Sequence, residues 1–357
     1  MTTQLPTSCT VTWCPVLNDN PYQALLEEAL RSLGANTVAV PRPTIRRALN
    51  AQFDRDILHI HWLEHLVRSN NSPKLSRPLT LLKSAHLVLV LRLIRHRGVR
   101  IVWTVHNLVP HETRYRRLEL WLSKHVARRA SVVIAHSAHC ARLVESTYGI
   151  QDVRVAYHPH FMDHYAPPIR TREEMRAELG VPEDVHTFLA FGQIRTYKQI
   201  PQLILALKET GRADFHLLIV GQCRSPTVRD EIESAIDGDR RVTVRFEFVP
   251  DDIVADIHAA ADVAVLNYRD VFSSSALMLA LSCGIPVIAP AKSTATEVAD
   301  PPVVQSYALG GLADALIRSA STPGPSSEVV RAVAAEYTWT ALAEPVLGEF
   351  SLVLDDQ

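Results

Sequence analysis

Two cations three residues apart follow directly on an apolar run, and their spacing indicates an anion site. The run 187–191 ends at Gly192, and Arg195 and Lys198 come next, close to the helix indicated by 199–207. Ligands of open α/β sheets bind beyond the carboxyl ends of strands, and helix N-termini attract anions through free N–H groups and the helix dipole. The segment therefore suits a diphosphate. The alternative is a surface turn carrying two solvated charges.

A second segment of the same kind lies downstream. The apolar run 262–268 ends at Tyr268, and three consecutive serines, among them Ser274 and Ser275, precede the expected helix 276–282. Small hydroxyl side chains and exposed amides at the start of a helix offer hydrogen bonds to an anion without steric obstruction. Two such segments in one half of the chain predict a single diphosphate ligand.

In the first half, His106 and Asn107 follow the apolar run 99–105 directly. This order places His106 at the carboxyl end of the fourth expected strand. A neutral imidazole can accept the proton of a hydroxyl group near neutral pH, or donate a hydrogen bond to a sugar hydroxyl. We take His106 as the catalytic candidate, either as a general base or in a positioning role.

Other polar residues follow the first and third expected strands. Asn20 and Tyr22 come after the first strand, where a pocket loop and a helix start are expected. His59, His61 and Glu64 belong to the third strand and its end. A period of two places both histidines on one face, so His61 is a candidate for the site, whereas His59 fits a core or surface histidine with satisfied hydrogen bonds.

The elements that must position these residues alternate as strands and helices. The expected strands are 11–14, 36–40, 57–62, 99–105, 131–135, 153–156, 187–191, 217–221, 262–268 and 284–290. This alternation is typical of parallel sheets with crossover helices. We expect an α/β protein with a Rossmann-like domain at 1–165, a second at 166–335, and a C-terminal helix within 336–357 that packs back on the first.

At these residues the chain resembles the GT-B-fold glycosyltransferases of family 4 and the bacterial exopolysaccharide and lipid-linked-oligosaccharide transferases. The stretch FGxIRxYK from Phe191 resembles the family's donor-phosphate segment, and Ser274-Ser275 resembles its Ser-Gly-small turn. The segments 217–221 and 248–252 resemble the next strand and the loop beside the nucleotide base. Trp339 resembles the aromatic residue that opens the family's C-terminal helix.

The resemblance implies two Rossmann-like domains facing a central cleft. It implies transfer of a hexose from a nucleotide diphosphate sugar to a hydroxyl of a glycan, which we take to be a lipid-linked intermediate of surface polysaccharide synthesis. The implied donor-binding residues are Gly192, Arg195, Lys198, Tyr268, Ser274, Ser275 and Glu297. From their positions at the strand ends of the first half, the acceptor-binding candidates are Asn20, Tyr22, His61, Glu64 and Asn107. The nucleotide sugar is a substrate, and neither a cofactor nor a metal ion is required.

One departure from the family concerns the ribose. Many family members carry two glutamates eight residues apart, the second binding the ribose, but Val271 and Leu279 occupy those positions here. Glu297 is the substitute we consider. Two other functions stay open: a nucleotide-sugar 2-epimerase with the same fold, and a non-catalytic paralogue that supports a partner transferase.

Composition and charge limit the remaining classes. The 357 residues, 47% hydrophobic and 21% charged, suit two globular domains. Five scattered cysteines lack CxxC spacing, and no secretion signal or spanning segment is evident, so we expect a cytoplasmic protein.

The first 165 residues hold 21 Lys+Arg and 11 Asp+Glu, and the remainder holds 16 and 27. The basic stretches 82–100 and 114–129 suggest peripheral contact with the inner face of an anionic membrane, while attraction between the two halves is the alternative. No motif supports nucleic-acid binding.

Overall fold

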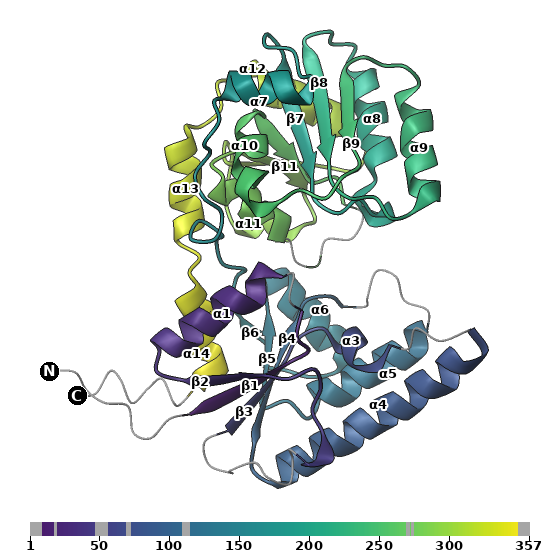
Figure 1. Ribbon diagram of the computed structural model, residues 1–357, viewed down its shortest axis with the longest axis vertical. Coiled ribbons are helices and arrows are strands. Elements are labelled where there is room, and N and C mark those ends of the chain that lie inside the picture. The colour runs from purple at the N-terminus through teal and green to yellow at the C-terminus, as the bar shows by residue number, and fades with distance from the viewer. Residues whose placement is uncertain are drawn as a thin grey trace, which may run out of the picture. The chain divides into compact units, whose positions relative to one another are not determined.

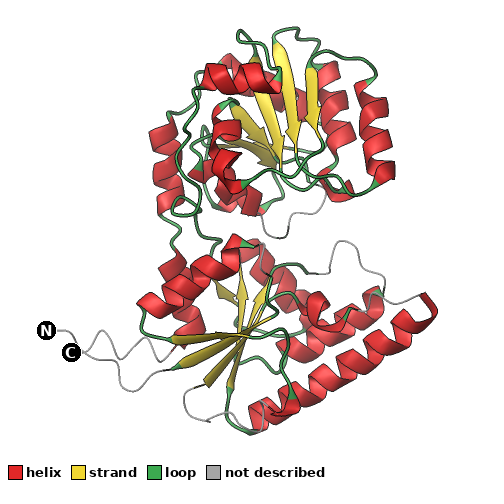
Figure 2. Cartoon of the chain, viewed as in Figure 1, coloured by secondary structure: helices red, strands yellow, loops and turns green. Residues whose placement is uncertain are grey.

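The computed structural model describes residues 9–17, 20–46, 56–68, 73–108, 115–268, 272 and 275–348. The chain forms two compact units: unit 1 comprises 1–157 and 338–357, and unit 2 comprises 158–337. The sequence-based boundaries at 165 and 335 lie eight and two residues from these divisions. Figure 1 labels the elements, and Figure 2 shows that helices flank a sheet within each unit.

Unit 1 contains a parallel six-stranded sheet in the order β2-β1-β3-β4-β5-β6. Its elements are β1 (Thr10–Cys14), α1 (Pro21–Ser32), β2 (Asn36–Ala39), β3 (Asp56–Ile60), α3 (Leu63–Val67), α4 (Pro73–His96), β4 (Arg100–Val105), α5 (Arg116–Ala127), β5 (Val132–Ala135), α6 (Ala138–Tyr148), β6 (Arg154–Val155) and α14 (Trp339–Leu347). The C-terminal α14 packs against α1.

Local signals explain where the helices of unit 1 begin. Asn20 caps α1 through Oδ1, which accepts a hydrogen bond from the Tyr22 amide, and Pro21 occupies the first helical position, where no amide donor is needed. Ser137 caps α6 in the same way, and Gly149 ends that helix in the left-handed conformation. Both helices therefore start directly beyond the carboxyl edge of the sheet.

Unit 2 contains a second parallel six-stranded sheet, in the order β12-β11-β10-β7-β8-β9. Its elements are α7 (Arg172–Leu179), β7 (His186–Phe191), η1 (Thr196–Lys198), α8 (Ile200–Glu209), β8 (Phe215–Val220), α9 (Pro226–Ile236), β9 (Val242–Arg245), η2 (Asp251–Ile253), α10 (Val254–Ala259), β10 (Val263–Val265), α11 (Ser275–Ser282), β11 (Val287–Pro290), η3 (Thr294–Glu297), β12 (Val304–Tyr307), α12 (Leu312–Ser321) and α13 (Ser327–Ala335).

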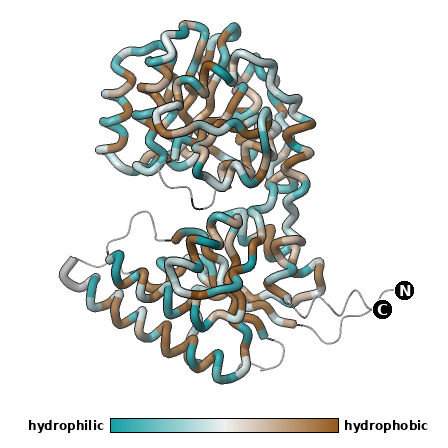
Figure 3. The backbone as a smooth tube through the Cα atoms, turned by 180° about the vertical axis from the view of Figure 1, so that it is seen from behind, coloured by the Kyte–Doolittle hydropathy of each residue, from teal (hydrophilic) through white to brown (hydrophobic). Residues whose placement is uncertain are grey.

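The central strands of unit 2 are apolar because helices cover both of their faces. Every residue of β8 is buried, and Phe188, Phe215 and Leu217 belong to a continuous hydrophobic core. Figure 3 shows hydrophobic backbone segments in both units. The two parallel sheets confirm the fold class predicted from the sequence.

Several predicted strands were too long, since 262–268 shortens to Val263–Val265 and 284–290 to Val287–Pro290. The expected strand 57–62 ends at Ile60, because Trp62 forms the N-cap of α3 and the His61 carbonyl accepts a hydrogen bond from the Trp103 indole at 3.2 Å. His61 and Trp62 consequently lie at the carboxyl edge of the sheet.

Candidate functional site

The carboxyl edge of the sheet in unit 2 carries the cationic segment. Gly192 follows β7 with φ of 90°, a left-handed conformation that favours glycine, and a Cβ there would lie 3.2 Å from the Lys198 Nζ atom. Gly221, after β8, packs so closely that an added Cβ would collide with the Gly192 carbonyl. The two glycines therefore allow the ends of β7 and β8 to lie directly beside the lysine.

Lys198 is buried, with 6% of its surface exposed. Its Nζ donates a hydrogen bond to the Phe191 carbonyl at 2.7 Å and lies 5.6 Å from the centre of the Tyr268 ring. Burial lowers the pKa of Lys198 to about 7, and the nearby Arg195 charge acts in the same direction. A bound anion would reverse both effects, so this lysine is suited to an anionic ligand.

The sequence analysis expects Lys198 close to the start of the following helix, and the structure places it in the turn η1, which directly precedes α8. Gln199 links η1 to α8 with φ of 49°. The Asn267 side-chain amide donates a hydrogen bond to the Gln199 carbonyl at 3.0 Å, and the Tyr307 hydroxyl donates to Asn267 Oδ1 at 2.6 Å. We call Asn267 and Tyr307 the turn brace, because they connect the ends of β10 and β12 to the turn that carries Lys198.

The other predicted donor residues occupy the same edge of unit 2. Tyr268 follows β10 and meets Tyr197 edge to face, with ring centres 5.5 Å apart. Ser275 is the exposed first residue of α11, and Glu297 ends η3, after β11. Ser274 lies outside the described residues.

The sequence analysis missed Ser293 in unit 2. This residue follows β11 and is 5% exposed, and within the described part of the chain its buried hydroxyl has no hydrogen-bond partner. Leu279, at the family's ribose-binding position, is buried in α11, while Val271 lies outside the described residues.

In unit 1, His61 follows β3 and His106 follows β4, so neighbouring parallel strands bring both to one edge. His61 Nδ1 and His106 Nε2 share a hydrogen bond of 3.1 Å. The Trp62 ring stacks on the His106 ring at 4.1 Å and 14°, and Tyr22 meets His106 edge-on at 4.9 Å. These contacts hold the His106 ring in one orientation.

A second layer of polar groups lies behind this pair. The His136 Nδ1–H group donates to the Ala156 carbonyl at 2.8 Å, so the Nε2 atom of the neutral ring accepts a hydrogen bond from the Tyr22 hydroxyl at 3.3 Å. His59 bonds the Thr104 hydroxyl at 2.8 Å. Tyr22 thus directs its hydroxyl toward His136, whereas the sequence analysis proposes that Tyr22 binds the acceptor substrate.

Burial keeps these histidines neutral. It lowers the pKa of His59 to about 3 and that of His136 to about 4. Burial also lowers the pKa of His61 well below its usual range, reinforced by His59, His106 and His136. The His61 ring therefore enters its bond with His106 uncharged.

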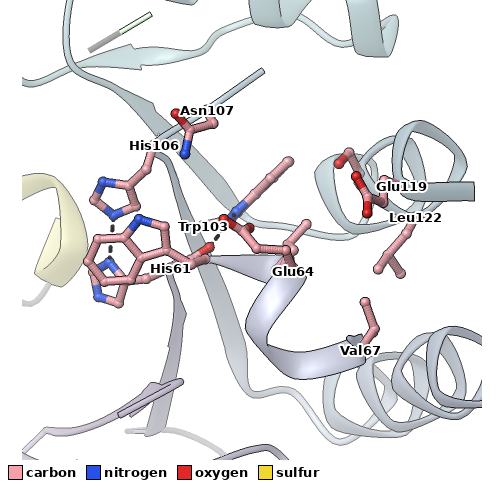
Figure 4. A pocket seen from close by; sticks show the side chains of 11 residues that line it. His61, Glu64, Val67, Trp103, His106, Asn107, Glu119 and Leu122 are labelled. Atoms are coloured by element: carbon pink, nitrogen blue, oxygen red, sulfur yellow. Dashed lines mark hydrogen bonds between the residues drawn. The ribbon is translucent and has the colours of Figure 1, made fainter. Parts of the chain in front are cut away.

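A recess adjoins the histidine pair, and its empty space, including the open mouth, is about 390 Å³. Figure 4 shows His61 and His106 at one side of it and residues of α5 at the other. The lining residues are His61, Trp62, Leu63, Glu64, Val67, Trp103, His106, Asn107, Glu119, Leu122 and Ser123. Burial raises the pKa of Glu64, and the nearby Glu119 charge acts in the same direction.

Several predicted residues of unit 1 thus come together, whereas Asn20 serves as the cap of α1. His61, Glu64, His106 and Asn107 line the recess. The sequence analysis missed His136 and Glu119. His136 directly follows an apolar strand, which is the signal that identified His106. Glu119 carried no such signal, because it stands within a helix.

Within the described part of the chain, no group of three or more His, Cys, Asp or Glu residues could hold a metal ion. The described helices include none that is both long and apolar enough to cross a membrane.

Comparisons with known proteins match both halves of the chain to glycosyltransferases. Residues 171–316 match the model of glycosyl transferases group 1, and residues 30–164 match that of glycosyltransferase family 4. The GDP-mannose:glycolipid 4-beta-D-mannosyltransferase of Xanthomonas campestris pv. campestris is 30% identical over 289 residues, covering 80% of this chain and 74% of that protein.

Solved structures share the fold at low sequence identity. HepE of Anabaena, solved in complex with UDP, has a TM-score of 0.66 at 16% identity and covers 98% of this chain and 100% of its own. The sucrose-phosphate synthase of Thermosynechococcus elongatus has a TM-score of 0.65 at 18% identity, with coverage of 98% and 97%.

Proposed function

Because this chain belongs to the GT-B glycosyltransferases of the group 1 and family 4 type, we propose that it transfers a hexose from a nucleotide diphosphate sugar to a hydroxyl group of a lipid-linked glycan. The donor class follows from the cationic segment of unit 2. The acceptor class follows from the relative that acts on a glycolipid. We further propose that the product is an intermediate of surface polysaccharide synthesis.

The observation that carries this proposal is the burial of Lys198 beside the end of β7. Transfer breaks the bond between the sugar's anomeric carbon and the diphosphate oxygen, and negative charge grows on the departing diphosphate. Lys198 and Arg195 would stabilise that charge, so they would contribute to catalysis as well as to binding. Ser293 adds a hydroxyl donor at the same edge.

The acceptor hydroxyl must lose its proton as it bonds to the anomeric carbon. His106 is the group we assign to this step, because it lies at the carboxyl edge of unit 1 and its neighbours fix its ring. Burial holds the His61 ring neutral, so it can either donate or accept the one hydrogen bond that it shares with His106. The direction of this bond sets which nitrogen of a neutral His106 ring is free of a proton.

Nucleotide-sugar screening tests the proposal. GDP-mannose or UDP-glucose at 100 times its dissociation constant should stabilise the folded chain by roughly 2.7 kcal/mol, measurable as a rise in melting temperature. Mass spectrometry should then show one added hexose on a glycolipid acceptor. A chain stabilised by neither nucleotide sugar, or one that only epimerises the donor, would contradict the proposal.

The exposed face of α4 and α5 supports action at a membrane surface. Leu81, Leu82 and Leu89 of α4 are 54%, 66% and 47% exposed, and Trp121 of α5 is 39% exposed. The two helices pack against each other, and their only acidic residue, Glu119, is buried.

The same pair of helices also carries several cations. They are Arg77, Lys83, Arg92, Arg95, Arg116, Arg117 and Lys124. Apolar side chains framed by cations suit the interface of an anionic bilayer, where each cation contributes about 1 kcal/mol. We propose that this face contacts the inner surface of the cytoplasmic membrane, which keeps the enzyme beside its acceptor.

Vesicle flotation tests this contact. The chain should float with phosphatidylglycerol vesicles and stay unbound with phosphatidylcholine vesicles. Leu82→Ser with Arg92→Ser should reduce flotation severalfold. Leu205→Ser is the matched control, because Leu205 is 55% exposed on α8 of unit 2. Equal flotation of the wild-type chain with both lipids would refute the proposed charge recognition.

A further inference from the structure

Glu119 has no evident structural role in the recess of unit 1. The residue is 8% exposed, and its buried Oε2 atom accepts no hydrogen bond from the described residues. A carboxylate oxygen taken out of water without a donor destabilises the folded state, and a leucine of similar size would avoid that cost. A donor from outside the protein, either a water molecule or a hydroxyl of a ligand, is therefore expected at this oxygen.

The rest of the lining favours a sugar hydroxyl. Glu64 provides a second carboxylate, Asn107 an amide and Ser123 a hydroxyl, while Trp103 provides an apolar wall. Carboxylates and amides beside an indole suit the alternating hydroxyl and C–H groups of a pyranose. The enclosed part of the recess is narrow, so it suits a hydroxyl or hydroxymethyl group of a ring that lies over the mouth.

The α5 helix connects this recess with the basic and apolar outer face. Arg117 and Trp121 are exposed, whereas Glu119 and Leu122, on the opposite side of the helix, are buried and line the recess. A glycan whose lipid is anchored beside the outer face would therefore need to reach only around one helix.

We infer that the recess recognises a hydroxyl group of the acceptor sugar, which donates a hydrogen bond to Glu119 while Glu64 contacts the same or the neighbouring hydroxyl. The inference rests on the proposed glycosyl transfer and adds a specificity-determining residue on the acceptor side. Glu119 selects among sugars that differ at one hydroxyl, whereas His106 acts on the reacting hydroxyl.

The experiment pairs variants with modified acceptors. Wild-type, Glu119→Gln, Glu64→Gln and the exposed control Glu28→Gln are assayed with GDP-mannose and UDP-glucose. The acceptors are octyl β-D-glucoside, octyl β-D-galactoside and the monodeoxy derivatives of each. Slow hydrolysis of the donor, measured without acceptor, reports the integrity of the donor side and of the fold.

We expect Glu119→Gln to lower kcat/KM for the acceptor about 10- to 100-fold, because glutamine replaces the charge-assisted hydrogen bond of the carboxylate with a weaker neutral one, while donor hydrolysis stays unchanged. One deoxy acceptor should show at least this loss with the wild-type chain and a much smaller additional loss with Glu119→Gln. Glu64→Gln should show a smaller loss in the same pattern, and Glu28→Gln none.

Three results would overturn the inference while the proposed function stands. A kcat/KM of Glu119→Gln equal to that of the wild type would leave water as the occupant of the recess. Losses from the deoxy acceptor and from Glu119→Gln that multiply would mean that Glu119 does not contact that hydroxyl. Wild-type chain that hydrolyses the donor but uses none of these glycosides would also overturn it. Failure to bind or hydrolyse either donor would instead remove the proposed function itself.

Discussion

The two units have the same kind of sheet but bury different kinds of side chain at its carboxyl edge. Each has a parallel six-stranded sheet whose carboxyl ends carry the candidate residues. Unit 2 buries a lysine there, and unit 1 buries a group of histidines. Burial lowers the pKa of both kinds of group, to about 7 for Lys198 and to about 4 for His136.

The consequences of these shifts differ. Lys198 is partly protonated near neutral pH, so an anion that restores its full charge gains binding energy. His59, His61 and His136 of unit 1 are neutral at the same pH, which suits hydrogen bonding to uncharged groups. Under the proposed function, the same fold would provide an anion site in one unit and a hydroxyl site in the other, because different side chains follow its strands.

The largest effect should come from His106 in unit 1. His106→Ala should lower kcat roughly 100- to 10,000-fold if the imidazole is the general base, while donor affinity stays near its original value. Steady-state kinetics and calorimetric titration with the nucleotide sugar measure the two quantities.

The pH profile adds a control for this variant. A general base loses activity as pH falls through its pKa, and His106→Gln should remove that limb of the profile. His65→Ala, at an exposed position in the neighbouring helix, should match the wild type. An unchanged rate for His106→Ala would remove this residue from the site.

In unit 2, substitution of Lys198 should lower the affinity for the donor. Lys198→Ala should weaken binding of the nucleotide diphosphate by about 1.5 to 3 kcal/mol, because a charge-assisted hydrogen bond to phosphate is lost, and should also lower turnover. Lys208→Ala, on the following helix, serves as a matched lysine control. Normal donor affinity and rate in both Lys198→Ala and Arg195→Ala would refute the anion site.

The pH dependence of donor binding sharpens the comparison. Lys198 has a pKa of about 7 in the free chain and must be protonated to hold the diphosphate, so affinity for GDP-mannose should be constant below about pH 6. It should fall up to about tenfold per pH unit above pH 7, as the free lysine loses its proton.

Calorimetry in buffers of different ionisation enthalpy should show proton uptake on binding at pH 8 and little at pH 6. Lys198→Met should abolish both the uptake and the pH dependence. Proton release, or a pH-independent affinity in the wild-type chain, would contradict this account of Lys198.

The smallest effect should come from the turn brace of Asn267 and Tyr307. Asn267→Ala should weaken donor binding about 2- to 10-fold, because the hydrogen bond that fixes the Gln199 carbonyl is lost. Tyr307→Phe should have a weaker effect in the same direction.

A second substitution, of Gln199 by glycine, distinguishes a role of the turn brace in positioning Lys198 from a role in the stability of the fold. Gln199→Gly in the Asn267→Ala background should restore part of the donor affinity, because glycine adopts the observed φ of 49° at little cost. A fall in melting temperature without a change in donor affinity would show that the brace serves only the fold.

The sequence predicted the parts of the site that depend on order along the chain. Apolar runs that end in Gly192 or His106 place the next residues at the carboxyl edge of a parallel sheet, whatever the details of packing. Strand order could not be read in this way, since β3 pairs with both β1 and β4 through contacts between distant segments.

The local pattern of apolar and polar residues therefore determined the fold class. It also determined that one sheet edge carries the cationic segment with Lys198 and the other carries the histidines with His106. Tertiary structure alone decided that Lys198 is buried, that His136 and Tyr22 hydrogen-bond behind the His61–His106 pair, and that Glu119 lines the recess. The physical reason is that burial, hydrogen bonding and the resulting pKa shifts depend on neighbours from other strands and helices, which the sequence order does not specify.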